Sequence, residues 1–210
     1  ITSRVHPGES NASWMVHGFL LFLLSPSPEA VALRNAFDWV IVPMLNPDGV
    51  IHGNYRCGLA GVDLNRIYDH PHKKLNPTIW HLMARIRERK PELFIDFHGH
   101  SKKEGVFFYG GRASDPETNG EIRLLPRLCC NGSDDFDWRS CCFGVQQSKM
   151  TTARLVSFVQ LGILRAYTVE ASLSCGAPCA GERSGMMRNG RLTMPASSCA
   201  SPGSPVSPLP

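Results

Sequence analysis

The sequence predicts an α/β fold in which a mixed central sheet is flanked by helices. Short β-branched or aromatic runs alternate with segments whose apolar residues recur at helical spacing, which is the pattern of alternating strands and helices. Several polar residues follow directly after the expected strands, where α/β sheets carry their active sites. The 210 residues are 42% hydrophobic and 19% charged, enough for one domain with a sizeable core.

The first 35 residues predict the end of a strand followed by two helices. Residues 1–5 predict the end of a strand. Ser10 and Asn11 predict the N-cap of a helix, because their short polar side chains can accept hydrogen bonds from exposed backbone N–H groups. Residues 14–23 give that helix its apolar side, and a second, short helix is expected over 30–35.

A buried strand and a longer helix follow. Residues 39–42 (Trp-Val-Ile-Val) predict a buried strand, since β-branched residues in a continuous apolar run suit a covered sheet. Residues 46–49 predict a turn. Asn76 followed by Pro77 predicts the start of a helix that Pro91 ends.

Three further strands are expected, over 93–97, 106–109 and 164–170. Residues 111–145 read as a cysteine-rich, loop-like stretch. From residue 176 the composition turns to small and turn-forming residues, which predicts a disordered tail.

The predicted organisation is therefore a domain over 1–175 and a low-complexity tail over 176–210. Because residues 1–5 read as the end of a strand, and because the tail replaces further structure, we expect the sheet to be incomplete at both ends.

Charge and cysteine content indicate which partners and which cellular compartment to expect. The net charge of +4 comes without a basic block, which argues against a nucleic-acid partner. The apolar run at 19–24 is too short to span a membrane. The eight cysteines include adjacent pairs and no C-x-x-C spacing, so we expect free thiols in a reducing, cytosolic compartment.

His6 and Glu9 form the first candidate metal motif. Pro7 and Gly8 between them favour a tight bend that can direct both side chains to one point. An isolated H-x-x-E is weak, and Glu9 at a helix start could instead only complement the helix dipole. Together with a later histidine, two nitrogens and one carboxylate would make a hydrolytic zinc site with an open position.

His98 and His100 are the candidates for that third ligand. They are two residues apart, so they point to the same face if the strand continues that far. Either can serve as the ligand, and the other would then be a neighbour. Asp96 shares the face and could orient a ligand histidine through its other ring nitrogen.

Other polar residues would complete a pocket. Asn65 and Arg66 could hold a carboxylate in a fork, and Arg56 could stabilise an oxyanion. Glu170 ends an apolar strand, where a carboxylate is costly unless it is paired or used, so it is a candidate general base. Each of these, like Arg154, could also be an ordinary surface or salt-bridging residue.

In combination these motifs resemble the zinc metallocarboxypeptidases, and more closely the cytosolic carboxypeptidases of the protein-deglutamylase type. The resemblance covers residues 3–175. The matching strings are RVHPGESN at 4–11, VPMLNPDGV at 42–50, GNYRC at 53–57, DLNR at 63–66, DFHGHS at 96–101 and YTVE at 167–170.

The resemblance implies a role for each site residue. His6, Glu9 and His98, rather than His100, would bind one zinc ion. Glu170 would activate water and Arg56 would stabilise the oxyanion. Asn65 and Arg66 would hold the terminal carboxylate, and Arg154 would face an acidic substrate side chain.

The implied function is removal of C-terminal or side-chain-linked glutamates from proteins such as tubulin. The implied partners are polyglutamylated tails, with neither nucleic acid nor membrane, in a cytoplasmic setting that includes association with microtubules. Two alternatives remain: an inactive fragment that binds glutamylated tails, and an amidohydrolase acting on small N-acyl amino acids.

Overall fold

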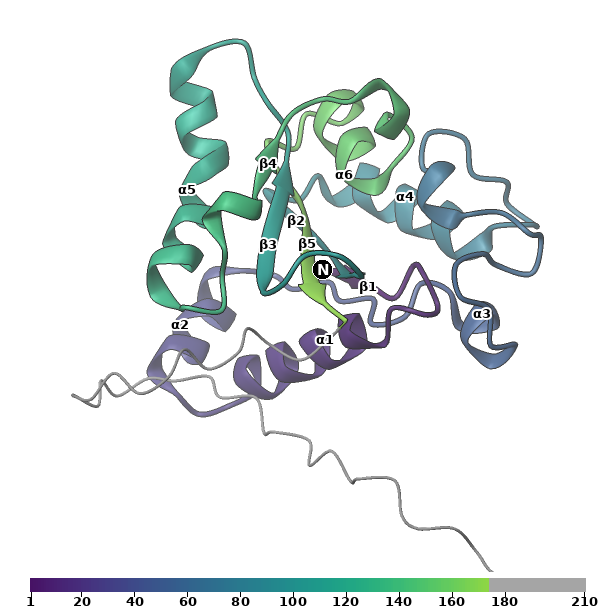
Figure 1. The fold of residues 1–210 in the computed structure, drawn as a ribbon, viewed down its shortest axis with the longest axis horizontal. Coiled ribbons are helices and arrows are strands. Elements are labelled where there is room, and N and C mark those ends of the chain that lie inside the picture. The colour runs from purple at the N-terminus through teal and green to yellow at the C-terminus, as the bar shows by residue number, and fades with distance from the viewer. Residues whose placement is uncertain (174–210) are drawn as a thin grey trace, which may run out of the picture. The chain divides into compact units, whose positions relative to one another are not determined.

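The computed structural model describes residues 1–173, and these build a sheet of five strands in the order β1-β2-β5-β3-β4 (Figure 1). β1, β2 and β5 are parallel, β3 is antiparallel to β5, and β4 is parallel to β3. The strands are β1 (Thr2–Ser3), β2 (Leu93–His100), β3 (Val106–Gly110), β4 (Cys142–Phe143) and β5 (Arg165–Ser172). The mixed α/β sheet expected from the sequence is confirmed.

Helices and short helical turns connect the strands. The helices are α1 (Ser10–Leu23), α2 (Pro28–Ala36), α3 (Pro47–Ile51), α4 (Pro77–Arg89), α5 (Pro116–Gly132) and α6 (Ala153–Leu155). The short turns are η1 (Leu64–Arg66), η2 (Trp138–Ser140), η3 (Gln147–Lys149) and η4 (Val156–Gln160). No single helix within residues 1–173 is long and apolar enough to cross a membrane; α1 and α2 meet that criterion only as a pair bent by 97°.

Adjacent residues of a strand point to opposite faces, so the sheet has two distinct sides. The site face carries Asp96 and His98 of β2 and Glu170 of β5, and nearer the start of these strands it packs against α4 and α6. The α5 face carries Tyr167 and Val169 and packs against Ile122 of α5.

The core of the site face begins where the polar residues end. Phe94 and Ala166 are paired neighbours on β2 and β5, and both pack into a buried cluster with apolar residues of α4. The buried residues of α4 are Ile79, Leu82, Met83 and Ile86. This apolar base positions the strand ends beyond it, where the register sets His98 beside Glu170.

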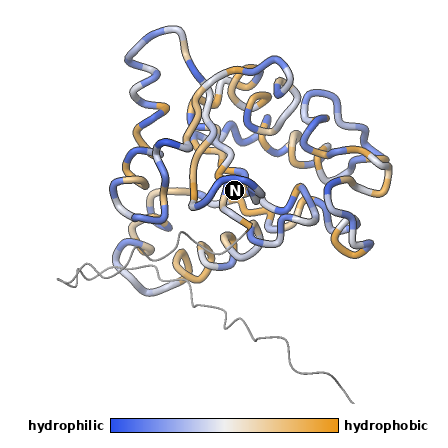
Figure 2. Tube along the Cα trace, in the orientation of Figure 1, coloured by the Kyte–Doolittle hydropathy of each residue, from blue (hydrophilic) through white to orange (hydrophobic). Residues whose placement is uncertain are grey.

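Two expectations about the first elements are wrong. The N-cap of α1 is Glu9, not Ser10 or Asn11, and no side chain caps that end. The side chain of Asn11 instead reaches the backbone of β5. Figure 2 shows that α1 is largely hydrophobic, and Trp14, expected on its buried side, is 62% exposed.

Residues 39–42 are not a buried strand. They make one isolated bridge, between Val42 and Thr2, and Val40 is exposed. The segment lies beside β1, on the side away from β2. Only its edge facing β1 is paired, and its apolar side chains are partly exposed to solvent. The expected turn at 46–49 begins the short helix α3, capped by Asn46.

The prediction of a loop over 111–145 is also wrong. The 17-residue helix α5 occupies much of it, starting with Asp115 as N-cap and Pro116 in the first turn. Pro126 inside the helix and Gly120 near its start hid it from propensity arguments. The helix is stabilised by burying Ile122 against the sheet.

The expected domain boundary at residue 175 and the expected disordered tail over 176–210 lie outside the described residues. Of the cysteines in the described part, Cys57, Cys129, Cys130, Cys141 and Cys142 are free thiols.

Candidate active site

The loop after β1 holds His6 and Glu9 in place. Arg4 has a left-handed backbone (φ 56°), which turns the chain sharply out of the strand. Its Nε donates to the carbonyl of Pro7 at 2.7 Å. A Cβ on Gly8 would lie 2.4 Å from the ring of Tyr55, so only glycine allows the loop to pass so close.

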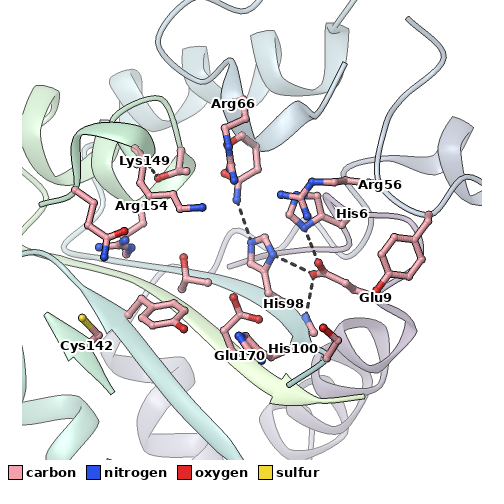
Figure 3. Close-up of a pocket in the computed structure, with 18 of the residues that line it drawn as sticks. His6, Glu9, Arg56, Arg66, His98, His100, Cys142, Lys149, Arg154 and Glu170 are labelled. Atoms are coloured by element: carbon pink, nitrogen blue, oxygen red, sulfur yellow. Dashed lines mark hydrogen bonds and ion pairs between the residues drawn. The ribbon is translucent and has the colours of Figure 1, made fainter. Parts of the chain in front are cut away.

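His6, Glu9 and His98 converge at the end of the parallel strands. His6 Nδ1 lies 2.7 Å from Glu9 Oε1, and His98 Nδ1 lies 3.1 Å from Glu9 Oε2. All three are buried, and one ligand atom from each lies within 4.8 Å of the others. Among the described residues, these three form the cluster that could hold a metal ion. Figure 3 shows the three side chains facing one another.

Each histidine is held from outside by a carboxylate. His98 Nε2 lies 2.7 Å from Asp96 Oδ2, and His6 Nε2 lies 3.1 Å from Asp63 Oδ1. A carboxylate accepts the Nε2 proton, so a neutral ring then turns an Nδ1 lone pair toward Glu9. Two lone pairs facing one buried carboxylate repel unless a proton or a cation lies between them. Carboxylate–histidine pairs of this kind orient zinc ligands, so the donor set fits zinc.

Electrostatics within the cluster point the same way. Burial raises the pKa of Glu9, but the hydrogen bonds of His6 and His98 outweigh it and leave that pKa below its usual range. Burial lowers the pKa of His98, but the charge of Asp96 and the hydrogen bonds that the ring makes to the carboxylates of Asp96 and Glu9 raise it well above its usual value. The cluster thus attracts positive charge to its centre.

His100 lies at the rim of the pocket. Its Nδ1 accepts the backbone N–H groups of Lys102 and Lys103, so it stabilises the turn after β2. Of the two histidines left open by the sequence motif, only His98 lies with His6 and Glu9.

A pocket of about 430 Å³ opens beside the cluster and gathers every site residue expected from the sequence. It is lined by His6, Glu9, Arg56, Asn65, Arg66, His98, Arg154 and Glu170. These residues come from loops, strands and short helical segments up to 164 positions apart, and their convergence is a product of the fold.

Glu170 faces the pocket from β5. Burial raises its pKa, the charge of His98 opposes that effect, and the charge of Glu9 adds to it. Its Oε2 is buried and makes no hydrogen bond to the protein. A carboxylate with a raised pKa and a vacant acceptor beside a metal-binding cluster has the properties of a general base.

Asp63 is a residue whose role the sequence motif did not reveal. Its Oδ1 contacts His6 and the backbone N–H of Asn65, while its Oδ2 accepts Arg56 Nε at 2.8 Å. One carboxylate therefore orients both a candidate metal ligand and a candidate oxyanion donor. The sequence shows Asp63 in the string DLNR, but not which histidine it meets.

Arg66 and Asn65 differ in how free they are. Arg66 donates to the carbonyl of Asn65 and is partly exposed in the pocket. Asn65 is buried, its Oδ1 accepts from Ala153 N at 2.9 Å, and its Nδ2 approaches His98 Nε2 at 3.5 Å. Asn65 is thus more firmly fixed than the fork expected from the sequence requires.

Arg154 and Lys149 lie across the pocket from Glu9 (Figure 3). Arg154 is buried and its Nη1 donates to the carbonyl of Gly110 at 2.7 Å. Burial lowers its pKa to about 10. Burial and the nearby Arg66 and Arg56 also lower the pKa of Lys149, a lining residue that the sequence did not single out. The far wall therefore carries concentrated positive charge.

Comparison with known proteins agrees with this geometry. A sequence profile of the zinc carboxypeptidases matches residues 1–137. Cytosolic carboxypeptidase 1 of Danio rerio is 43% identical over 194 residues, covering 84% of this chain. Cytosolic carboxypeptidase 2 of Homo sapiens is 48% identical over 177 residues, covering 82%. The chain spans only 17% and 20% of the lengths of these two relatives.

Solved structures share the fold. A metallo-carboxypeptidase from Burkholderia cenocepacia superposes with a TM-score of 0.71 and 30% identity, covering 81% of this chain and 46% of that one. A metallo-carboxypeptidase from Pseudomonas aeruginosa, in complex with (2-guanidinoethylmercapto)succinic acid, gives 0.69 and 27%, covering 81% and 47%. The matched profile, the relatives and the fold together show that this chain belongs to the zinc carboxypeptidase family.

Proposed function

We propose that this chain carries out a zinc-dependent metallocarboxypeptidase reaction, removing C-terminal or side-chain-linked glutamates from proteins such as tubulin. The observation that supports this most is the meeting, in one pocket, of a His/Glu/His cluster, a buried carboxylate and several cations. The names of the relatives support a cytoplasmic setting. Action on tubulin would bring the protein to microtubules.

In this proposal His6, Glu9 and His98 hold one zinc ion, with Asp63 and Asp96 fixing the two rings from outside. A zinc ion in such a site supplies Lewis acidity, which polarises a carbonyl and acidifies water. The protein's own residues then carry the proton transfers and bind the charges.

Glu170 is the proposed base. Its buried carboxylate accepts a proton from the attacking water and returns it to the amine that leaves when the C–N bond breaks. The vacant Oε2 supports this role, because it has no protein donor to compete with water. The raised pKa also makes the second step, proton donation, easier than for an ordinary carboxyl.

Arg56 is the proposed oxyanion donor. Asp63 binds its Nε, which leaves the other guanidinium N–H groups able to turn into the pocket. Arg66, with the fixed Asn65 beside it, would bind the substrate's free terminal carboxylate. A site that must pair this carboxylate selects chain ends, because an internal peptide bond has no such charge.

Arg154 and Lys149 would bind the acidic side chain of the removed residue. A carboxylate entering the pocket needs a cationic partner to offset its lost hydration, and these two residues supply it.

The test is to incubate the full 210-residue chain with zinc and a peptide ending in several glutamates, and to measure released glutamate. We expect release that a chelator abolishes and zinc restores. A peptide with an amidated C-terminus and one ending in glutamines should be poor substrates. If N-acyl glutamate is cleaved faster than the peptide, the amidohydrolase alternative holds instead. If zinc binds and no substrate is cleaved, the proposal fails.

A further inference from the structure

Asn11 joins α1 to the strand that carries Glu170. Its Nδ2 donates to the carbonyl of Ala171 at 2.7 Å and to the carbonyl of Ser172 at 3.1 Å. These are the two residues directly after Glu170 in the chain. The side chain of Asn11 is therefore a link between the helix that follows the metal loop and the end of β5.

Gly99 makes the link possible. A Cβ on Gly99 would lie 2.2 Å from Asn11 Oδ1, far inside contact distance, so only glycine lets the amide pass. Neighbouring residues of a strand point to opposite faces, and Gly99 follows His98. Asn11 therefore approaches the sheet from behind the pocket.

The same glycine also contacts the metal loop. The backbone N–H of Gly99 donates to Glu9 Oε2 at 2.9 Å. Glu9 thus accepts a hydrogen bond from the backbone of Gly99. Asn11, two residues after Glu9, fills the space where a side chain at position 99 would lie and reaches β5. The loop of His6 and Glu9, the end of β2 and the end of β5 are held in one arrangement.

The position of the Glu170 carboxylate depends on the backbone that carries it, because the side chain makes few contacts that would hold it in place. Its Oε2 makes no hydrogen bond to the protein, so the position of the carboxylate depends on the backbone of β5. At that point β3 is just beginning: Val106, its first residue, pairs with Ala171. Ser172, the last residue of β5, pairs with His100 of β2, and its backbone N–H donates to the carbonyl of Gly105 at 3.0 Å. Asn11 supplies extra hydrogen bonds where the sheet ends.

We propose that Asn11 is a positioning residue for Glu170, acting through the backbone of Ala171 and Ser172 and across Gly99. The inference rests on the proposed function, since it assigns Asn11 to the same reaction. It gives Asn11 of the string HPGESN and Gly99 of the string DFHGH one shared structural role.

The first test is Asn11→Ala in the full chain with zinc. A displacement of the base by about 1 Å can cost on the order of 10²-fold in rate, so we expect kcat to fall by about that factor. KM and zinc affinity should change by less than about threefold, because the side chain of Asn11 makes no hydrogen bond to a metal ligand or to a substrate-binding residue. Asn11→Asp, which keeps the shape and removes both donors, should lose at least as much. Asn35→Ala, in the exposed part of α2, is the matched control and should change nothing.

The second test uses Gly99. Gly99→Ala alone should lower kcat and the melting temperature, because its Cβ displaces the Asn11 amide. In the Asn11→Ala background the clash is gone, so adding Gly99→Ala should cost much less than it does alone. Strictly additive effects would overturn the proposal, as would an Asn11→Ala variant with parental kcat or with zinc affinity reduced in parallel with kcat.

A third measurement separates this inference from the proposed function. Hydrogen exchange of the amides at 170–173 should speed up in Asn11→Ala and stay unchanged in Asn35→Ala, whether or not the parent cleaves peptide. Unchanged exchange there would overturn the link itself. An inactive parent with faster exchange in Asn11→Ala would refute the enzymatic proposal and leave the link standing.

Discussion

The two faces of the central sheet differ in chemistry, although the same strands form both: one carries the polar groups of the site and the other is apolar. On the site face, Asp96 and His98 are buried and Glu170 is half-buried, and the desolvation of the first two is offset by their contact with each other and with Glu9. On the α5 face, Phe108, Tyr167 and Val169 pack with α5 through apolar contact.

This contrast indicates that different groups of residues determine the function and the stability of the protein. A buried polar cluster is costly to desolvate and is retained for the chemistry it performs. An apolar cluster is favourable by itself and holds the strands in register. Substitutions among the polar groups of the site face should therefore affect catalysis and metal binding more than unfolding, and substitutions in the apolar cluster of the α5 face should do the reverse.

The largest expected effect is that of Glu170→Gln. Losing the base should lower kcat by about 10²–10⁴-fold. The free energy of unfolding at pH 7 should stay equal or rise, because the variant removes a buried carboxylate that lacks one hydrogen-bond partner. Glutamate release and urea denaturation measure the two quantities. A variant that remained fully active would place the base elsewhere.

Ile122→Ala tests the opposite face. Ile122 is fully buried between α5 and the sheet, so its truncation should lower the free energy of unfolding by about 2–5 kcal/mol. Zinc affinity of the folded protein should change little, since no metal ligand contacts it. Leu124→Ala, at an exposed position of the same helix, is the control and should stay within about 0.5 kcal/mol. If Ile122→Ala weakened zinc binding without unfolding the protein, the two faces would be coupled.

Asp96→Asn tests whether the outer carboxylates serve the metal. Replacing the partner of His98 Nε2 should weaken zinc affinity by about 10–100-fold, because the amide holds the ring less firmly and lowers its basicity. Competition with a chromogenic chelator gives the affinity. Asp48→Asn, at an exposed carboxylate in α3, should bind zinc as the parent does. Equal affinities for both variants would mean that Asp96 has only a structural role.

The smallest effect is expected for Tyr167→Phe on the α5 face. The hydroxyl donates to the carbonyl of Ile122 at 2.7 Å, and losing this bond should cost about 0.5–1.5 kcal/mol at pH 7. Burial raises the pKa of Tyr167 to about 12. The folded state therefore favours the neutral phenol, and this contribution is complete below about pH 10 and lost as the pH rises toward 12. Unfolding curves of the parent and the variant should converge over that range.

Local patterns predicted the elements that depend on neighbouring residues. Asn76 and Pro77 start α4, and the apolar runs before His98 and Glu170 are β2 and β5. The edge segment at 39–42 and the helix α5 were mispredicted because both depend on what lies beside them. A β-branched run does not reveal whether its second edge is covered, and Pro126 outweighs the rest of α5 in any propensity argument.

The sequence by itself determined the chemistry of this protein. His6 and Glu9 lie three residues apart, a spacing that any tight bend brings together, and the motifs around them identify the family. Only the tertiary structure decided which distant groups complete the site. Asp63 meets His6 across 57 residues, and Asn11 meets β5 across 160. Such contacts are set by strand register and by the space that Gly99 leaves open, and neither is written in the spacing of residues along the chain.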